Sequence, residues 1–340
     1  MSTTEARPAH AELAERAQEE EHLGRWEAAA AAYAHSFRAA ILANDVESAA
    51  DALRGQGRVL IQEERYDDAE ELVELSREIA ERAGVVQSAA RALNVLGIIR
   101  FKQRRWEQAR AYYDAALERA IDVGDDDLAG LALQNAGVIA YYLGDLREAR
   151  ALYLESIGSF VRSGNSGNAL LTYNNLGLAC VNLRDWLEAD IYYSRGIEIA
   201  ERHSKSPLLA KLYGNRAEAL IHIGELDEAT LSLRKAEIAA DAVGDRDAMA
   251  DVYRLRGMIA RTGGDFDTAE TAVLRALELA TDPSMERAEA YREMAALRAA
   301  EGLTEDARSA FRAASEIYRN LGGDAYAATT EVELAALDRV

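Results

Sequence analysis

Two stretches of this 340-residue chain align without a gap, LNVLGIIRFKQRRWEQARAYYDAA at residues 93–116 and YNNLGLACVNLRDWLEADIYYSRG at residues 173–196. Both contain a Leu-Gly pair, a Trp nine residues after the Gly, an Ala three residues after the Trp, and then Tyr-Tyr. Chance rarely preserves so many spacings, so the two stretches indicate an internal repeat.

The Trp position, called the marker here, recurs along the chain at a step of forty residues, except for a last step of thirty-eight. The markers are Trp26, Tyr66, Trp106, Leu146, Trp186, Leu226, Phe266 and Thr304. An Ala stands three residues after every marker, and a Gly or Ala stands nine residues before it. A Leu or Tyr stands thirteen residues before the marker, and a small residue ten after it. The chain therefore contains eight copies of one unit.

Each unit is predicted to be a pair of helices, because its bulky and small positions four apart share one helical face. In the fourth unit, for example, the helices are expected near residues 127–143 and 146–162. A Gly often stands at the turn between them, as at Gly144, where a positive φ is needed. Pro8, Pro207 and Pro283 fall only where first helices are expected to begin. Asp125, Asp245 and Asp324 follow the glycines that end second helices and are predicted to cap the next helix.

The sequence thus predicts an all-α solenoid of eight helix hairpins and a C-terminal capping helix, forming a single domain over residues 1–340. The repeats are expected near 8–45, 46–85, 86–125, 126–165, 166–205, 206–245, 246–283 and 284–322, with the capping helix at 323–340. Residues 323–340 repeat only the first half of a unit, which suits a helix covering the last apolar face.

Composition excludes several classes of protein. The 59 Asp and Glu residues outnumber 39 Lys and Arg, giving a net charge of −20, which disfavours nucleic acids and anionic membranes as partners. No apolar stretch reaches the length of a transmembrane helix. The single cysteine, Cys180, is expected to be a buried thiol and favours a reducing, cytoplasmic location.

The repeat resembles the tetratricopeptide repeat (TPR) family. The residues that carry the resemblance in one unit are Leu96, Gly97, Trp106, Ala109, Tyr113 and Ala116. Those in another are Leu176, Gly177, Trp186, Ala189, Tyr193 and Gly196. The forty-residue length is similar to the repeats of kinesin light chains, spindle-orientation adaptors and bacterial peptide-pheromone receptors. The resemblance implies a right-handed superhelix whose concave groove, lined by first helices, binds a peptide, as in scaffold, adaptor and sensor proteins of this family.

The resemblance also implies which residues line the groove, since these lie between four and fifteen residues before each marker. The implied peptide-binding residues are Arg54, Arg58, Arg91, Asn94, Lys102, Gln134, Asn135, Tyr142, Asn174, Asn175, Asn182, Lys211, Asn215, His222 and Arg254.

Two interpretations of these residues remain open. Asn135, Asn175 and Asn215 form one column, and an Asn amide can pair with both the N–H and the C=O of an extended peptide. The same column can instead bridge neighbouring helices. In the second to fifth units the cations face Asp51 alone, so we expect a basic groove that favours an acidic segment or a C-terminal carboxylate.

No motif points to catalysis, a metal or a cofactor, and we expect a non-enzymatic protein. The histidines are scattered, and Cys180 has no second cysteine for a zinc site. Gly55-Gln56-Gly57 lies inside an expected helix, and Asp125-Asp126-Asp127 is interpreted as a helix cap. Tyr113 and Tyr193 match a core column and are expected to pack. The main hypothesis is a module that binds a protein or peptide partner; the alternatives are a self-associating scaffold and a sensor of a small peptide.

Overall fold

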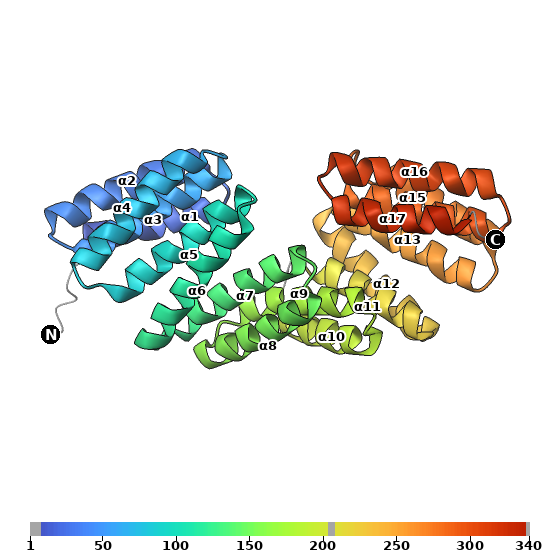
Figure 1. The fold of residues 1–340 in the computed structure, drawn as a ribbon, viewed down its shortest axis with the longest axis horizontal. Coiled ribbons are helices and arrows are strands. Elements are labelled where there is room, and N and C mark those ends of the chain that lie inside the picture. Colours follow the sequence, from blue (N-terminus) through green and yellow to red (C-terminus); the bar gives the residue numbers. More distant parts are fainter. Residues whose placement is uncertain (1–7, 203–207, 338–340) are drawn as a thin grey trace. The chain divides into compact units, whose positions relative to one another are not determined.

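The structure is a computed structural model that describes residues 8–202 and 208–337, and these residues form α helices with no strand (Figure 1). The all-α prediction is confirmed. The chain divides into two compact units, Met1–Asn175 and Leu176–Val340, whose boundary falls within a helix. Each unit is described by itself below, and a single uninterrupted solenoid stays a prediction.

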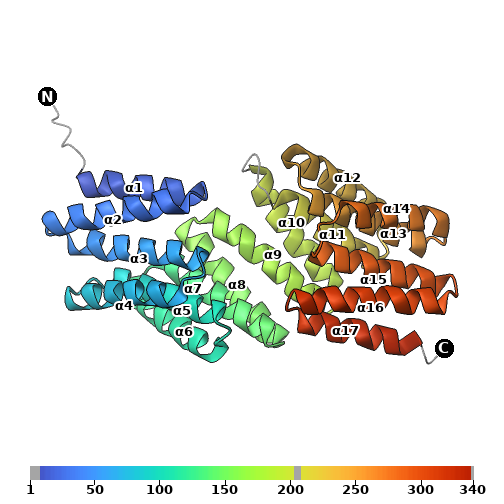
Figure 2. The same cartoon turned by 90° about the horizontal axis from the view of Figure 1, so that it is seen from above.

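Helices of 13 to 18 residues follow one another in antiparallel pairs, seen in two views in Figures 1 and 2. Unit 1 contains α1 (Ala9–His22), α2 (Trp26–Leu42), α3 (Val46–Gln62), α4 (Tyr66–Arg82), α5 (Val86–Lys102), α6 (Trp106–Val123), α7 (Asp126–Tyr142) and α8 (Leu146–Ser163). The boundary lies in α9 (Ser166–Asn182). Unit 2 contains α10 (Trp186–Arg202), α11 (Leu209–Ile223), α12 (Leu226–Val243), α13 (Arg246–Thr262), α14 (Phe266–Leu279), α15 (Met285–Ala300), α16 (Thr304–Asn320) and α17 (Asp324–Ala336).

Every marker residue is the first residue of an even-numbered helix, so the forty-residue period is the distance along the chain between the starts of successive second helices. Two residues before each marker the backbone turns through a positive φ, as at Gly144 (φ 84°). In three hairpins a residue with a side chain occupies this position: Glu64 (φ 59°), Arg104 (φ 59°) and Arg184 (φ 63°). These three residues accept a conformation that costs a non-glycine residue roughly 1–2 kcal/mol.

The Gly column is explained by a bulky side chain on the partner helix, which is a tyrosine ring in three hairpins and a valine in two. A Cβ built on Gly137 of α7 would lie 2.7 Å from the ring of Tyr153 on α8, and one on Gly177 would lie 2.5 Å from Tyr193. Both rings, and that of Tyr113, are at most 2% exposed. The predicted packing role of Tyr113 and Tyr193 is confirmed.

The small column ten residues after the marker has a role that volume alone does not predict. In three hairpins it is a buried serine whose hydroxyl donates to a backbone carbonyl twenty-six residues earlier, on the first helix of the same hairpin. The bonds are Ser36 to His10 (2.9 Å), Ser76 to Ala50 (2.6 Å) and Ser156 to Gly130 (2.8 Å). Each therefore ties together the two helices of one hairpin.

Successive hairpins share buried apolar clusters, and their second helices also form ion pairs. In unit 1 Arg119 of α6 donates to Glu81 of α4 at 2.8 Å, and Arg110 of α6 donates to Glu148 of α8 at 2.8 Å. All four side chains are at least 30% exposed, so the pairs lie at the surface.

The predicted helix ends are mostly confirmed. Asp125 caps α7 by accepting from the backbone N–H of Leu128 (3.0 Å), and Asp245 caps α13 in the same way. α17 begins with Asp324, and Gly323 is at its N-cap position; the side chain of Asp324, for which capping was predicted, lies outside the described residues. Pro8 precedes α1 as expected, whereas Pro207 lies outside the described residues.

The final helix covers the end of unit 2 as predicted. Leu334 of α17 packs against the buried cluster that contains Phe311, and Ala327 packs against Tyr318, both on α16. Over the described residues, every helix is too short or too polar to cross a membrane.

Candidate functional site

The residues implied to bind a peptide all lie on odd-numbered helices, the first helices of the hairpins, as predicted. Neighbouring first helices contact one another within each unit, α1 with α3, α3 with α5 and α5 with α7 in unit 1, and α11 with α13 and α13 with α15 in unit 2. We call the surface that they form in each unit its first-helix face. The candidate site is described for the two faces separately.

In unit 1, α3 carries Arg58, which bridges two hairpins. Its Nε and Nη2 donate to the carboxylate of Glu21 on α1 at 2.9 and 2.8 Å, and Nη2 also donates to the hydroxyl of Tyr33 at 2.9 Å. Burial raises the pKa of Glu21, but the hydrogen bonds and charge of Arg58 outweigh burial and hold that pKa below its usual range. Arg58 is therefore already engaged by a carboxylate of the chain.

The other arginines of this face are paired in the same manner. Arg54 is buried and donates to Asp51 at 2.6 Å, and Arg91 of α5 donates to Asp125 at 3.1 Å. The expectation that the cations face Asp51 alone is wrong, because Glu21 and Asp125 reach them from flanking hairpins. Lys102, which is exposed at the end of α5, has no ion pair among the described residues.

The Asn column bridges helices at Asn135. Asn135 of α7 donates its Nδ2 to Oδ1 of Asn94 on α5 at 3.1 Å, and Asn94 is only 7% exposed. Gln134, Asn174, Asn175 and Asn215 are half-buried, and Asn182 donates to the Leu178 carbonyl of its own helix at 2.9 Å. The bridging interpretation thus holds for the first pair, and contact between any of these amides and a peptide stays a prediction.

Tyr142 belongs to an aromatic cluster that spacing within one unit did not reveal. Its ring stacks on Trp106, with centroids 5.8 Å apart and planes 10° apart, and meets Phe101 edge-on at 5.6 Å. Tyr142 is 64% exposed, so one side of its ring is open to solvent. In unit 2 the ring of His222 stacks on that of Trp186, with centroids 3.9 Å apart. Like Trp106 and Tyr142, this pair joins a marker to the residue thirty-six positions after it.

The first-helix face of unit 2 contains a pocket of about 220 Å³. Two of the predicted residues, His222 and Arg254, lie in its wall. Met258 and Phe311 supply apolar surface. The remaining residues of the lining are Glu218, Arg261, Glu289, Arg292, Glu293, Ala296 and Glu333. The predicted Lys211 and Asn215 lie on α11 and do not line the pocket.

Ion pairs occupy every guanidinium in this pocket. Arg254 is buried and donates to Glu218 at 2.9 Å and to Asp251 at 2.7 Å. Burial raises the pKa of Glu218, but Arg254 more than offsets it, so the pKa stays below its usual range. Burial lowers the pKa of His222, which is therefore mainly neutral at pH 7.

Two forked pairs in the same pocket repeat the pattern. Arg261 donates to both oxygens of Glu293 at 2.5 and 3.1 Å, and Arg292 donates to both oxygens of Glu333 at 2.9 Å. Sequence reasoning missed these residues because no column of one residue type marks them. The signal available was a Glu or Arg on each successive first helix, which is common on any helical surface.

The columns of the sequence correspond to a known repeat over part of the chain. Residues 88–160, which include α6, α7 and most of α5 and α8, match the family profile described as the tetratricopeptide repeat. The chain contains tetratricopeptide repeats. The resemblance inferred from the marker columns is confirmed.

Solved TPR structures share the fold. A Rap protein complexed with competence and sporulation factor has a TM-score of 0.55 at 15% identity, covering 97% of this chain and 98% of its own. BtubC (BKLC) from P. vanneervenii has a TM-score of 0.55 at 18% identity, covering 69% and 91% respectively. A signal transduction ATPase with numerous domains from Pyrococcus horikoshii, which has a TPR sensor, has a TM-score of 0.68 at 13% identity, covering 95% and 50%.

At these identities the likeness extends to the fold alone. No curated protein sequence matches this TPR chain. Within residues 8–202 and 208–337, His, Cys, Asp and Glu side chains form no group of three that could hold a metal ion.

Proposed function

We propose that this TPR chain is a non-enzymatic module for protein–protein interaction, which binds an extended segment of a partner on its first-helix faces. The observation that carries the proposal is the pocket of unit 2, where His222 and Arg254 meet an apolar surface on the face that the sequence implied. The carboxylate of Glu218, with its lowered pKa, suits an ion pair better than a general acid.

The exposed aromatic ring of unit 1 supports the same proposal. Tyr142 is held in a fixed orientation by Trp106 and offers a flat apolar surface beside its hydroxyl. Such rings contribute contact area at little cost in conformational entropy, which is why they are enriched in binding surfaces. One protein of similar fold, the Rap protein, was solved with competence and sporulation factor, which is consistent with the proposal.

The preference for acidic segments or a C-terminal carboxylate now rests on fewer residues. Arg54, Arg58 and Arg91 are held by carboxylates of the chain, so a partner carboxylate would have to displace them. Lys102 and Lys211 are exposed and are available to it. A cytoplasmic location and the absence of nucleic-acid or membrane partners stay predictions.

The test is a panel of synthetic peptides measured by fluorescence anisotropy against the full chain. The panel pairs acidic with basic sequences, and free with amidated C-termini. We expect acidic, free-carboxylate peptides to bind best, and Lys102→Glu with Lys211→Glu to weaken them by about tenfold. Arg234→Glu reverses an exposed charge on a second helix and is the matched control.

Two results would count against the proposal. One is the absence of saturable binding by any peptide in the panel. The other is binding that survives Tyr142→Ala together with Asn175→Ala and Asn215→Ala. Asn135 is left unchanged in this variant, because its bond to Asn94 holds two hairpins together.

A further inference from the structure

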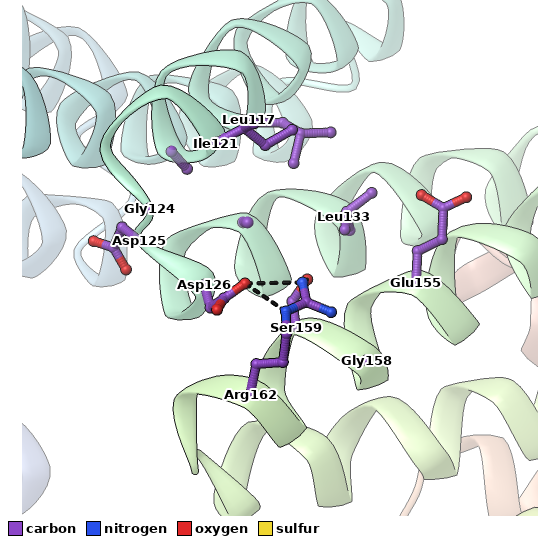
Figure 3. Close-up of a pocket in the computed structure, with 12 residues that line it drawn as sticks. Leu117, Ile121, Gly124, Asp125, Asp126, Leu133, Glu155, Gly158, Ser159 and Arg162 are labelled. Atoms are coloured by element: carbon purple, nitrogen blue, oxygen red, sulfur yellow. Dashed lines mark hydrogen bonds and ion pairs between the residues drawn. The ribbon is translucent and has the colours of Figure 1, made fainter.

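A second cavity lies away from the first-helix faces. In unit 1 a cavity of about 430 Å³ opens between the second helices α6 and α8, and α7 forms its floor (Figure 3). Ala120, Ala129 and Leu133 line it and are at most 5% exposed, whereas Ile121, at its edge, is 66% exposed. The cavity therefore joins an apolar floor to open solvent. We call it the α6–α8 groove.

The groove exists because α8 carries a glycine, Gly158, where every other second helix carries a large residue. Gly158 stands twelve residues after its marker and Ser159 thirteen after it. The equivalent residues in two preceding second helices are Glu78 and Ile79 in α4, and Glu118 and Arg119 in α6. The missing side chains leave α8 without atoms that would fill the space toward α6.

Gly158 has no packing role inside the chain. A Cβ built on it would meet only Nη1 of Arg162, at 3.6 Å, an ordinary contact, whereas a Cβ on Gly137 would collide with a ring. A glycine inside a helix costs roughly 0.5–1 kcal/mol relative to alanine. The chain therefore gives up helix stability at Gly158 without any gain in its own packing, and what the glycine preserves is the opening.

The rim of the groove is acidic. Asp125, Asp126 and Glu155 line it, and the one cation in the lining is Arg162, which is bound to Asp126 at 2.8 Å (Figure 3). A neighbouring cavity of about 410 Å³ shares Asp125, Asp126 and Arg162 and adds Asp127.

Several of these carboxylates are already bonded. Arg91 pairs with Asp125 from the first-helix side, and Asn165 donates to Asp127 at 2.6 Å. Glu155 is exposed and makes no ion pair among the described residues. Four carboxylates against the guanidiniums of Arg162 and Arg91 leave the rim with a net negative charge, and Glu155 is available to a ligand.

We propose that the α6–α8 groove docks a peptide segment of a partner protein that carries an aliphatic side chain next to a Lys or Arg. The aliphatic side chain enters between Ala120 and Leu133, and the cation contacts Glu155. Charge complementarity selects this occupant, because an acidic segment would meet the carboxylates of the rim. The groove opens between second helices and shares no lining residue with the set predicted for the first-helix faces, so it is independent of the function proposed for those faces.

The experiment selects random phage-displayed peptides on the full chain in the presence of excess soluble Gly158→Leu protein. A Leu at this position fills the groove without changing charge, so the soluble competitor removes peptides that bind elsewhere. We expect the surviving peptides to share an aliphatic residue next to Lys or Arg. Survivors that are acidic or share no such pair, or a selection that leaves none, would overturn the proposal.

Fluorescence anisotropy of a surviving peptide then tests the site directly. Gly158→Leu and Glu155→Lys should each weaken binding by about tenfold or more, corresponding to about 1.4 kcal/mol. Gly158→Ala is the control, because its single methyl group leaves the groove open, and binding should stay within about twofold. Equal binding to wild-type and Gly158→Leu protein would contradict the proposal.

Two further measurements verify the folding and the oligomeric state of the variants. In circular dichroism melts we expect Gly158→Leu and Gly158→Ala to be folded and at least as stable as wild type. Sedimentation velocity tests whether a second copy of this chain occupies the groove. Self-association that Gly158→Leu abolishes would replace the peptide proposal with a homotypic interface.

Discussion

Replacing Gly137 by alanine tests most directly whether the buried ring of Tyr153 requires a glycine at the position that faces it. The new methyl group would lie 2.7, 2.8 and 3.2 Å from three ring atoms of Tyr153, whose ring is 2% exposed and cannot move outward freely. Overpacking of this kind costs about 1–3 kcal/mol, while the gain in helix propensity from glycine to alanine is about 0.5–1 kcal/mol. We expect Gly137→Ala to destabilise the hairpin by about 1 kcal/mol, within a range of roughly 0–2.5.

The same hairpin offers a matched control and a rescue. Gly158→Ala is also a glycine-to-alanine change inside a helix, but its methyl group meets only Arg162, so it should stabilise by about 0.5–1 kcal/mol. Tyr153→Leu should make Gly137→Ala harmless. The sixth unit already combines Ala217 and Leu233 at the two equivalent positions, and both belong to one buried cluster.

Urea unfolding followed by circular dichroism measures the midpoints. Native-state hydrogen exchange, analysed over α7 and α8, measures the local effect, since repeat chains do not always unfold in two states. The reasoning is refuted if Gly137→Ala and Gly158→Ala shift stability equally. It is also refuted if the Tyr153→Leu background leaves the cost of Gly137→Ala unchanged.

Three further predictions concern single contacts. Glu21→Gln should lower the free energy of unfolding by about 1–2 kcal/mol at pH 7, because it breaks the half-buried ion pair with Arg58. The folded-state pKa of Glu21 is lowered, so this difference from wild type should shrink as the pH falls below the ordinary value of 4.5. Unfolding midpoints measured as a function of pH test this prediction. Arg104→Gly should raise stability by about 0.5–1 kcal/mol in thermal melts by relieving the positive φ, whereas Arg105→Gly, at φ −92°, should not. Asn135→Ala should cost about 1–2 kcal/mol in urea unfolding because a buried amide loses its partner, and an unchanged midpoint would contradict the bridging role.

The fold could be predicted almost completely because its determinants are local and periodic. A marker such as Trp106 begins a second helix, and the Gly nine residues before it receives the ring seven residues after it. One stretch of forty residues therefore specifies the hairpin, and its repetition specifies the stack. The positions of helix ends follow from the same period to within about one residue, as at α17, which begins with Asp324.

The site was predicted in position and only partly in chemistry. The first-helix placement of Arg58 and Arg91 followed from the period, but their partners Glu21 and Asp125 lie more than thirty residues away on neighbouring hairpins. Spacing within one unit gives no information about which side chain of the next unit reaches across. For the same reason the groove at Gly158 was not foreseen, since a gap between two helices is a property of both.

The two kinds of contact in unit 1 respond differently to ionic strength. Serine hydroxyls such as that of Ser76 hold three hairpins together from a buried position, whereas pairs such as Arg119–Glu81 link hairpins at the surface. At about 1 M salt the Debye length falls to about 3 Å, so the surface pairs weaken and the buried bonds do not. Salt should therefore weaken the ionic part of the coupling between hairpins and leave the buried clusters that span them intact, so that raising the ionic strength lowers the cooperativity of the array only in part.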